Sequence, residues 1–173
     1  MQLLLVNDVY LLEPRADGTG GLARVATLVR GLRRAQPNTL FVLAGDTLSP
    51  SLLSTLFRGR QMVEAWNLLE LDAATFGNHE FDWGPAVLRE RILESRFLWL
   101  SANVLDRHTR RPFGGAWPWL ARDLGGVRVG MVGLTCPRPS TPRIPDPRSP
   151  SRCRGRPRGP PSRRWARWIC AWR

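Results

Sequence analysis

The chain has no lysine and few cysteines or histidines, and these absences narrow the kinds of site it can hold. All 26 of its basic residues are arginine, and the 173 residues include three cysteines and two histidines, His79 and His108. An odd number of cysteines without a Cys-x-x-Cys pair supports neither a disulfide framework nor a zinc site. Arginine in place of every lysine is typical of a GC-rich coding sequence and does not by itself indicate contacts to phosphate groups.

Long apolar runs are also absent. No stretch of about 18 apolar residues occurs, so the sequence predicts no membrane span. The chain opens directly on the strand-like run Gln2–Val6, without a basic leader or a small-residue cleavage site. We therefore expect the product, as written, to stay in the cytoplasm.

The net charge of +12 belongs mostly to the end of the chain. Residues 1–136 hold 15 arginines against 13 acidic residues, whereas residues 137–173 hold 11 arginines and a single acidic residue. The second stretch has nine prolines and no leucine or valine, so it cannot bury enough apolar surface to fold. The sequence therefore predicts a folded domain over residues 1–136 and a disordered, basic tail over residues 137–173.

The composition of this tail leaves a second class of function open. Tryptophan and isoleucine recur at helical spacing between arginines near its end, at Trp165, Trp168, Ile169 and Trp172. Such a segment could bind nucleic acid or an anionic membrane surface. Salt-dependent DNA binding that is lost on deleting residues 137–173 would support this alternative. A charge run is more often a solvated, unselected segment, so nucleic acid is not the expected partner. A fragment without function is the third possibility.

Strand and helix patterns alternate along the first 134 residues, which is typical of an α/β fold with a largely parallel sheet. Short apolar runs predict strands at residues 3–6, 40–43, 73–76, 97–100 and 127–134. The first of these runs is continuously apolar, so we expect that strand to be covered on both faces. Helices are predicted from Gly20 to Leu32, from Leu52 to Phe57 with Ser51 or a neighbour as the cap, from Met62 to Leu69, and from Pro85 to Leu93.

Oxygen-bearing side chains follow three of the predicted strands. Asp8, Asp46 and Asn78 each come shortly after an apolar run, so a parallel sheet would place them at the carboxyl ends of its strands. Hard divalent ions prefer carboxylate and carbonyl oxygens as ligands, and a carboxylate can bridge two ions. The pattern therefore predicts a metal site of the kind that polarises a phosphoryl group and activates water.

Polar side chains continue directly after Asn78. Adjacent residues at a strand end point apart, so His79 is predicted to contact a substrate phosphate or to protonate a leaving oxygen. Asp82 follows three residues later and could hold the imidazole in its productive tautomer. Glu80 is interpreted as a structural residue that turns this loop.

These residues carry a resemblance to a known superfamily. The first three motifs of the calcineurin-like metallophosphoesterases are similar to Val6-Asn7-Asp8-Val9-Tyr10, to Gly45-Asp46 with Ser51, and to Gly77-Asn78-His79-Glu80-Phe81-Asp82. The 5′-nucleotidase and 2′,3′-cyclic phosphodiesterase branch is also similar at Gly20-Gly21-Leu22-Ala23-Arg24 and at Ser101-Ala102-Asn103-Val104. The likeness covers residues 2–135.

The resemblance implies a fold and a set of roles. The fold would be a four-layer α/β/β/α sandwich, of which residues 1–136 supply a partial domain, the first half. Asp8, Asp46 and Asn78 would be metal ligands, and Asn103 would line the phosphate site. His79 with Asp82 would form the catalytic dyad. The complete family holds two divalent ions, with Mn, Zn, Mg and Ca not distinguished here. Its substrate would be a nucleotide or another phosphoester.

The chain departs from the family pattern at its first motif and beyond residue 136. Tyr10 stands where the first motif commonly has histidine. A phenol with a pKa near about 10 is a poor ligand at neutral pH, so Tyr10 is expected to support a ligand or to bind weakly. The 173 residues contain neither the later histidine motifs of the family nor its nucleoside-binding domain. We therefore expect a truncated phosphoesterase that holds one ion tightly or none, and whose activity the sequence does not decide.

The change of composition after Cys136 has its own interpretation. A GC-rich gene read out of frame would give such a mixture of arginine, proline, tryptophan and cysteine, so a frameshifted or mispredicted reading frame is the hypothesis. Sequencing the locus tests it. Half a sandwich would also leave an open sheet edge and an uncovered face, which predicts low solubility.

Overall fold

The computed structural model describes residues 1–136, and the following account concerns that part of the chain. The tail predicted to be disordered, residues 137–173, lies outside the described residues. So does the segment in which tryptophan and isoleucine recur at helical spacing, from Trp165 to Trp172. The boundary between the predicted domain and the predicted tail therefore stays a prediction.

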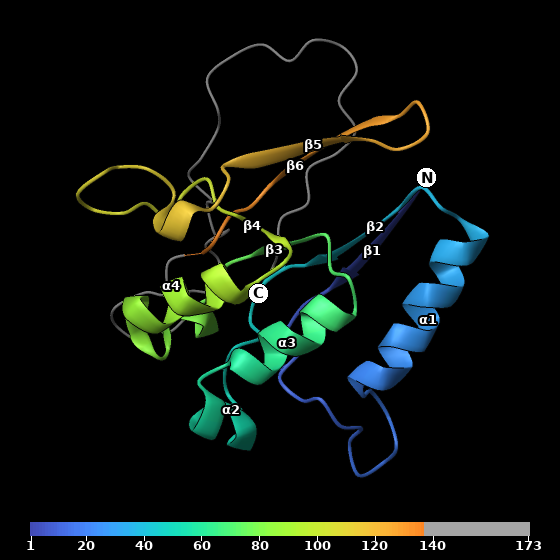
Figure 1. The fold of residues 1–173 in the computed structure, drawn as a ribbon, viewed down its shortest axis with the longest axis horizontal. Coiled ribbons are helices and arrows are strands. Elements are labelled where there is room, and N and C mark those ends of the chain that lie inside the picture. The colour runs from blue at the N-terminus through green and yellow to red at the C-terminus, as the bar shows by residue number, and fades with distance from the viewer. Residues whose placement is uncertain (137–173) are drawn as a thin grey trace, which may run out of the picture.

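A four-stranded parallel sheet forms the centre of the fold, as Figure 1 shows. Its spatial order is the order of the chain, β1-β2-β3-β4, and each neighbouring pair is parallel. The strands are β1 (Gln2–Val6), β2 (Thr39–Leu43), β3 (Ala73–Thr75) and β4 (Leu98–Leu100). The predicted α/β class with a parallel sheet is confirmed.

The helices lie together on one face of this sheet (Figure 1). They are α1 (Leu22–Ala35), α2 (Leu52–Phe57), α3 (Arg60–Leu68) and α4 (Gly84–Glu94). All four predicted helices are therefore present. Ser51 caps α2, because its side chain accepts a hydrogen bond from the Ser54 backbone N–H at 3.0 Å. Helix α1 buries Leu22, Ala26 and Val29, the predicted apolar face.

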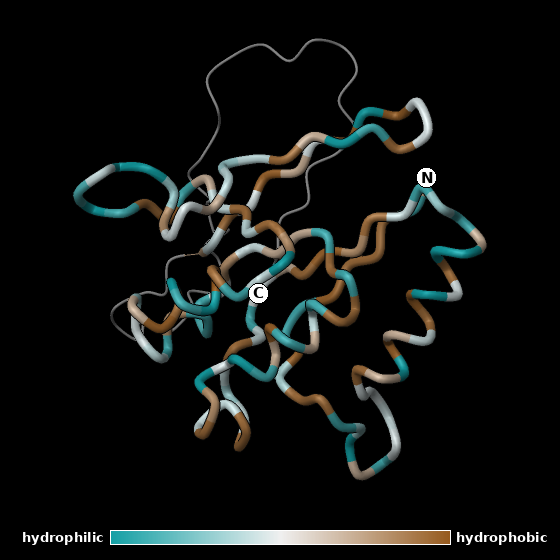
Figure 2. The backbone as a smooth tube through the Cα atoms, viewed as in Figure 1, coloured by the Kyte–Doolittle hydropathy of each residue, from teal (hydrophilic) through white to brown (hydrophobic). Residues whose placement is uncertain are grey.

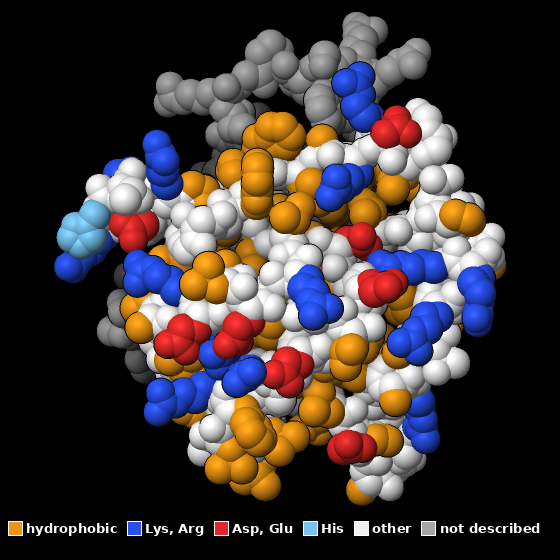
Figure 3. Space-filling model, in the orientation of Figure 1, with side chains coloured by type: hydrophobic (Ala, Val, Ile, Leu, Met, Phe, Trp, Pro, Cys, Tyr) orange, Lys and Arg blue, Asp and Glu red, His pale blue; other side chains and the backbone are white. Residues whose placement is uncertain are grey.

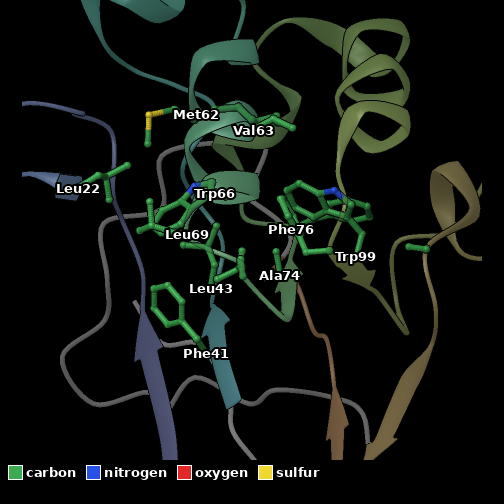
Figure 4. Close-up of a cluster of buried hydrophobic side chains, with 14 of the residues drawn as sticks. Leu22, Phe41, Leu43, Met62, Val63, Trp66, Leu69, Ala74, Phe76 and Trp99 are labelled. Carbon is green, nitrogen blue, oxygen red and sulfur yellow. The ribbon is translucent and has the colours of Figure 1, made fainter. Parts of the chain in front are cut away.

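The core fills the space between these helices and the sheet (Figure 4). Met62, Val63 and Trp66 of α3 are fully buried there, and the Trp66 ring meets Phe41 of β2 edge-on at 6.0 Å. Phe76, directly after β3, stacks on Trp99 of β4 with ring centroids 5.1 Å apart. Figure 2 shows the same partition, with hydrophobic colour along the strands and an alternating pattern along α1.

A two-stranded hairpin covers part of the opposite face of the sheet. Strand β6 (Arg128–Val132) was expected from the sequence, and it pairs antiparallel with β5 (Trp119–Asp123). Leu120 and Met131 of the hairpin pack against Val42, Ala73 and Leu100 of the main sheet. Strand β5 was not predicted. Four of its five residues, Trp-Leu-Ala-Arg-Asp, are exposed, so the sequence has no apolar run or regular alternation there.

The expectation that the first strand is covered on both faces is wrong. Leu3 and Leu5 are 37% and 46% exposed, whereas Leu4 and Val6 pack on the helix side. The reason is position: β1 is an edge strand of the described sheet, and the hairpin packs over β2, β3 and β4 instead. Within residues 1–136, β1 is therefore an open edge of the sheet, and the face opposite the helices is uncovered at β1.

The α-helices of the described part of the chain have between 6 and 14 residues. None of them is long and apolar enough to cross a membrane. Figure 3 shows apolar side chains gathered at the end of the molecule where α2 lies, and Leu52, Leu56 and Phe57 of that helix are exposed.

Candidate metal centre and catalytic dyad

The carboxyl ends of three neighbouring strands surround one small pocket. Parallel strands β1, β2 and β3 end at the same edge of the sheet, and their following turns carry Asp8, Asp46 and Asn78. All three predicted metal ligands line this pocket, whose volume is about 80 Å³. Its complete lining is Asn7, Asp8, Ala44, Asp46, Phe76, Gly77, Asn78, Leu134, Thr135 and Cys136.

Both aspartates have unusual backbone conformations. The φ angle is 55° at Asp8 and 61° at Asp46, in the left-handed region that residues other than glycine rarely adopt. Their side chains are held by neighbours: Asp46 Oδ1 accepts from the His79 backbone N–H at 2.9 Å, and Asp8 Oδ1 accepts from the Tyr10 hydroxyl at 2.7 Å. Backbone strain at positions held this firmly is characteristic of functional sites.

Two glycines allow the turns after β2 and β3 to touch. Gly45 has φ +87°, and a Cβ there would lie 2.6 Å from the Gly77 backbone nitrogen. A Cβ at Gly77 would overlap the Asp46 carboxylate itself. The close approach of these two turns therefore requires glycine at both positions, and it places Asp46 beside the loop that carries Asn78 and His79.

Replacing Gly77 by alanine is expected to displace the Asp46 carboxylate. The added methyl cannot be accommodated without moving backbone, which costs about 1–3 kcal/mol of stability. The free energy of unfolding, measured by urea titration, should fall by this amount. Gly31→Ala is the matched control, because Gly31 lies inside α1 with open space around its Cβ position. That control should be neutral or stabilising by about 0.5–1 kcal/mol, and equal losses in both variants would contradict the steric account.

His79 and Asp82, the two residues predicted to form a dyad, are in contact in the structure. His79 Nδ1 lies 2.7 Å from Asp82 Oδ2, and both side chains are partly exposed. An ionised carboxylate can only accept, so this contact favours the tautomer with the proton on Nδ1. The Tyr10 ring meets the His79 ring edge-on at 5.7 Å, which fixes the imidazole from a second side.

Tyr10 connects the two halves of the site. Its hydroxyl donates to Asp8 and its ring contacts His79, so one residue touches both a predicted metal ligand and the predicted proton donor. The two sequence alternatives for Tyr10 were support of a ligand and weak ligation. The hydrogen bond to Asp8 favours the first.

Asn103 is not among the residues that line the pocket, but it is bonded to Thr135, which is. Its amide nitrogen donates to the Thr135 carbonyl at 2.6 Å, and its amide oxygen accepts from the Thr135 N–H at 2.9 Å. The Thr135 hydroxyl in turn donates to the Phe76 carbonyl. In this structure Asn103 therefore braces a pocket-lining segment, and its predicted contact with substrate stays a prediction.

Glu80 has a larger part in the site than its sequence position indicates. It is 1% exposed, and its carboxylate accepts backbone N–H bonds from Asp46 and Thr47 as well as from Gly77. Burial raises the pKa of the Glu80 carboxyl, and the three N–H donors oppose that rise. Glu80 is the one buried residue of the segment from Gly77 to Asp82, and a charged residue type gives no sign of burial in the sequence. The bonds to the turn after β2 were not predictable.

Comparison with known proteins now decides the family. The family model described as calcineurin-like phosphoesterase matches residues 1–130. The chain belongs to the calcineurin-like phosphoesterase family. Among curated proteins, rat and human 5′-nucleotidase are each 37% identical to it over 149 residues, covering 78% of this chain and 26% of theirs.

Solved structures with names of the same kind are also similar to this chain. The NAD nucleotidase of Haemophilus influenzae superimposes with a TM-score of 0.69 at 28% identity, covering 77% of this chain and 26% of its own. The 5′-nucleotidase precursor of Thermus thermophilus gives a TM-score of 0.66 at 37% identity, covering 78% and 28%. This phosphoesterase chain therefore spans about a quarter of the length of these relatives.

Calcineurin-like phosphoesterases use divalent metal ions, so the family implies a metal requirement. Two aspartates and an asparagine at one pocket are a donor set that fits a divalent ion preferring oxygen ligands. Within residues 1–136, no group of three or more histidine, cysteine, aspartate or glutamate side chains could hold a metal. The fit therefore depends on the amide oxygen of Asn78 together with the two carboxylates.

Proposed function

We propose that this chain is a phosphoesterase of the 5′-nucleotidase type that binds a divalent ion through Asp8, Asp46 and Asn78. Its proposed reaction is hydrolysis of the phosphate ester of a nucleotide. The observation that carries the proposal is the adjacency of two different groups: oxygen donors lining one pocket, and a histidine held by a carboxylate beside them. The names of the 37%-identical relatives indicate the substrate class.

The division of roles follows from the chemistry of each side chain. A bound divalent ion supplies Lewis-acid stabilisation of phosphoryl oxygens. Asp8 and Asp46 contribute the negative charge that holds a cation in the pocket, and Asn78 contributes a neutral oxygen. Since the described residues supply three donors, we propose a single tightly held ion.

His79 supplies the proton that the departing oxygen needs. With Nδ1 bound to Asp82, the protonated imidazole carries its transferable proton on Nε2. Asp82 keeps the ring oriented and stabilises the imidazolium, so the imidazole carries a proton before the departing oxygen takes it. The Tyr10 ring edge limits rotation of the imidazole in the same way.

The experiment is phosphate release from adenosine monophosphate by the purified full chain, with Mn²⁺ and with a chelator. We expect release that requires Mn²⁺ and is lost in Asp46→Asn. Glu64→Gln is the matched control, since it removes an exposed carboxylate whose partner is Arg60 on α3. Phosphate release that is equal with chelator, or equal in Asp46→Asn and the unaltered chain, would overturn the proposal.

A further inference from the structure

The turn after β2 wraps around the carboxylate of Glu80. Glu80 Oε1 accepts from the Thr47 N–H at 2.8 Å and from the Leu48 N–H at 3.4 Å, and Oε2 accepts from the Asp46 N–H at 2.9 Å. Consecutive backbone N–H groups that converge in this way form a concave anion-binding nest. Here the anion is a side chain of the protein, delivered from the turn after β3.

The nest includes the backbone of Asp46 itself, so the Glu80 carboxylate holds that backbone in place. Its three N–H groups belong to Asp46 and the two residues after it, and Asp46 has the left-handed φ of 61°. That conformation is uncommon for residues with a Cβ, although aspartate adopts it more often than most. The Glu80 carboxylate stabilises this backbone conformation, because in it the N–H groups of Asp46, Thr47 and Leu48 all point at the carboxylate.

The hydrogen bonds of Glu80 and Asp46 connect the turn after β2 with the turn after β3 in both directions. Asp46 Oδ1 accepts from the backbone N–H of His79, the residue directly before Glu80. The Gly77 N–H, on the other side of Asn78, also donates to Glu80. Thus Glu80 holds the Asp46 turn, and Asp46 holds the backbone of the dyad histidine. A shift in any one of these groups shifts the others.

Glu80 is not placed to react with substrate. Its carboxylate is buried and both of its oxygens are occupied by backbone N–H donors. It is also not among the residues that line the pocket. Its effect on chemistry must therefore pass through Asp46 and the turn that carries Asn78 and His79.

We infer that Glu80 is a positioning residue of the metal centre, the internal anion that fixes Asp46 and the Asn78–His79 segment relative to each other. This inference rests on the proposed metal site and deepens it. It predicts that Glu80 raises the metal affinity of the folded protein, in addition to any contribution to its stability. A residue with a purely structural role would change the folded fraction but leave the affinity of folded molecules unchanged.

The first test is Mn²⁺ titration of Glu80→Gln by calorimetry, at a temperature where circular dichroism shows the variant folded. Glutamine keeps the shape but aims an amide N–H₂ group at backbone donors, so the nest loses an acceptor. We expect the dissociation constant to rise about 10–100-fold, as for other residues that orient metal ligands. Leu88→Ala is the matched control, because Leu88 is fully buried in α4 and away from the pocket. It should lose stability and keep its affinity for Mn²⁺.

The second test does not depend on metal. In the unaltered chain, the amides of Asp46, Thr47 and Gly77 should exchange with solvent as slowly as those of the β1–β2 ladder, although they lie in turns. In Glu80→Gln they should exchange at least about ten-fold faster relative to that ladder. Fast exchange of these amides in the unaltered chain overturns the inference even if no variant folds.

The outcomes separate the two proposals. If the unaltered chain binds no Mn²⁺, the metal-site proposal fails, and amide exchange alone decides whether Glu80 orders the two turns. If the unaltered chain binds Mn²⁺ and folded Glu80→Gln binds it equally well, the inference fails and the metal site stands. If Glu80→Gln and Leu88→Ala lose stability and lose Mn²⁺ affinity by the same factor, Glu80 is only structural and the inference fails.

Discussion

Replacing His79 by alanine is expected to lower the rate of hydrolysis of a nucleoside monophosphate by about 10²–10⁴-fold, the usual contribution of a positioned general acid. The affinity for Mn²⁺ should change little. The reason is that Asp46 is held by the backbone N–H of residue 79, which alanine retains, and not by the imidazole. Steady-state phosphate release and Mn²⁺ titration on the same sample measure the two effects.

The leaving group separates proton donation from a general loss of structure. A nucleoside alkoxide needs a proton as it departs, whereas p-nitrophenolate leaves readily without one. The loss in His79→Ala should therefore be much smaller with p-nitrophenyl phosphate than with adenosine monophosphate. Asp82→Asn should show the same pattern with a smaller loss, because the amide still orients the ring but does not stabilise its charge. Equal losses on both substrates would contradict the assignment of His79 as proton donor.

Replacing Trp66 by alanine is expected to destabilise the fold by about 3–5 kcal/mol, the range for truncating a buried tryptophan. Trp66 of α3 is fully buried, and its ring packs edge-on against Phe41 (Figure 4). Its Nε1–H donates to the Thr47 hydroxyl at 2.9 Å, and that hydroxyl donates to the Val9 carbonyl at 2.7 Å. The indole therefore supports the turns after β1 and after β2, the same turns that carry Asp8 and Asp46.

Urea unfolding followed by circular dichroism measures this effect. Trp66→Phe keeps most of the apolar burial but leaves the Thr47 hydroxyl without its donor, so it should cost about 1–3 kcal/mol. Trp119→Ala is the control, because Trp119 on β5 is exposed, and it should stay within about 0.5 kcal/mol of the unaltered chain. A Trp66→Ala variant no less stable than Trp119→Ala would contradict the packing account.

The predictable parts of the fold are those that depend only on residues close together in the sequence. Apolar runs marked the four strands of the main sheet, and Ser51 marked the start of α2 because a cap needs only neighbouring residues. Strand β5 was not predictable, since its residues are mostly exposed and it gains its shape by pairing with β6. The exposure of Leu3 and Leu5 was mispredicted because an apolar run does not reveal whether its strand lies at an edge.

The same division holds for the site. Asp8, Asp46 and Asn78 could be grouped in advance because parallel strands end at one edge of a sheet. The Asp82 contact with His79 followed from a spacing of three residues. The contact of Tyr10 with both Asp8 and His79 could not be foreseen. The role of Glu80 was also hidden, because its partners at Asp46 and Thr47 are more than thirty residues away in the chain.

The most direct test of the account is calorimetric titration of the purified chain with Mn²⁺, repeated with Asp8→Asn, Asp46→Asn and the surface control Glu64→Gln. Three oxygen donors at one pocket predict saturable binding at a single site, unchanged in Glu64→Gln. Each aspartate variant should lose at least about ten-fold in affinity, since each removes a charged ligand. No binding by the unaltered chain, or binding that survives both aspartate substitutions, would show that these strand ends do not form a metal centre.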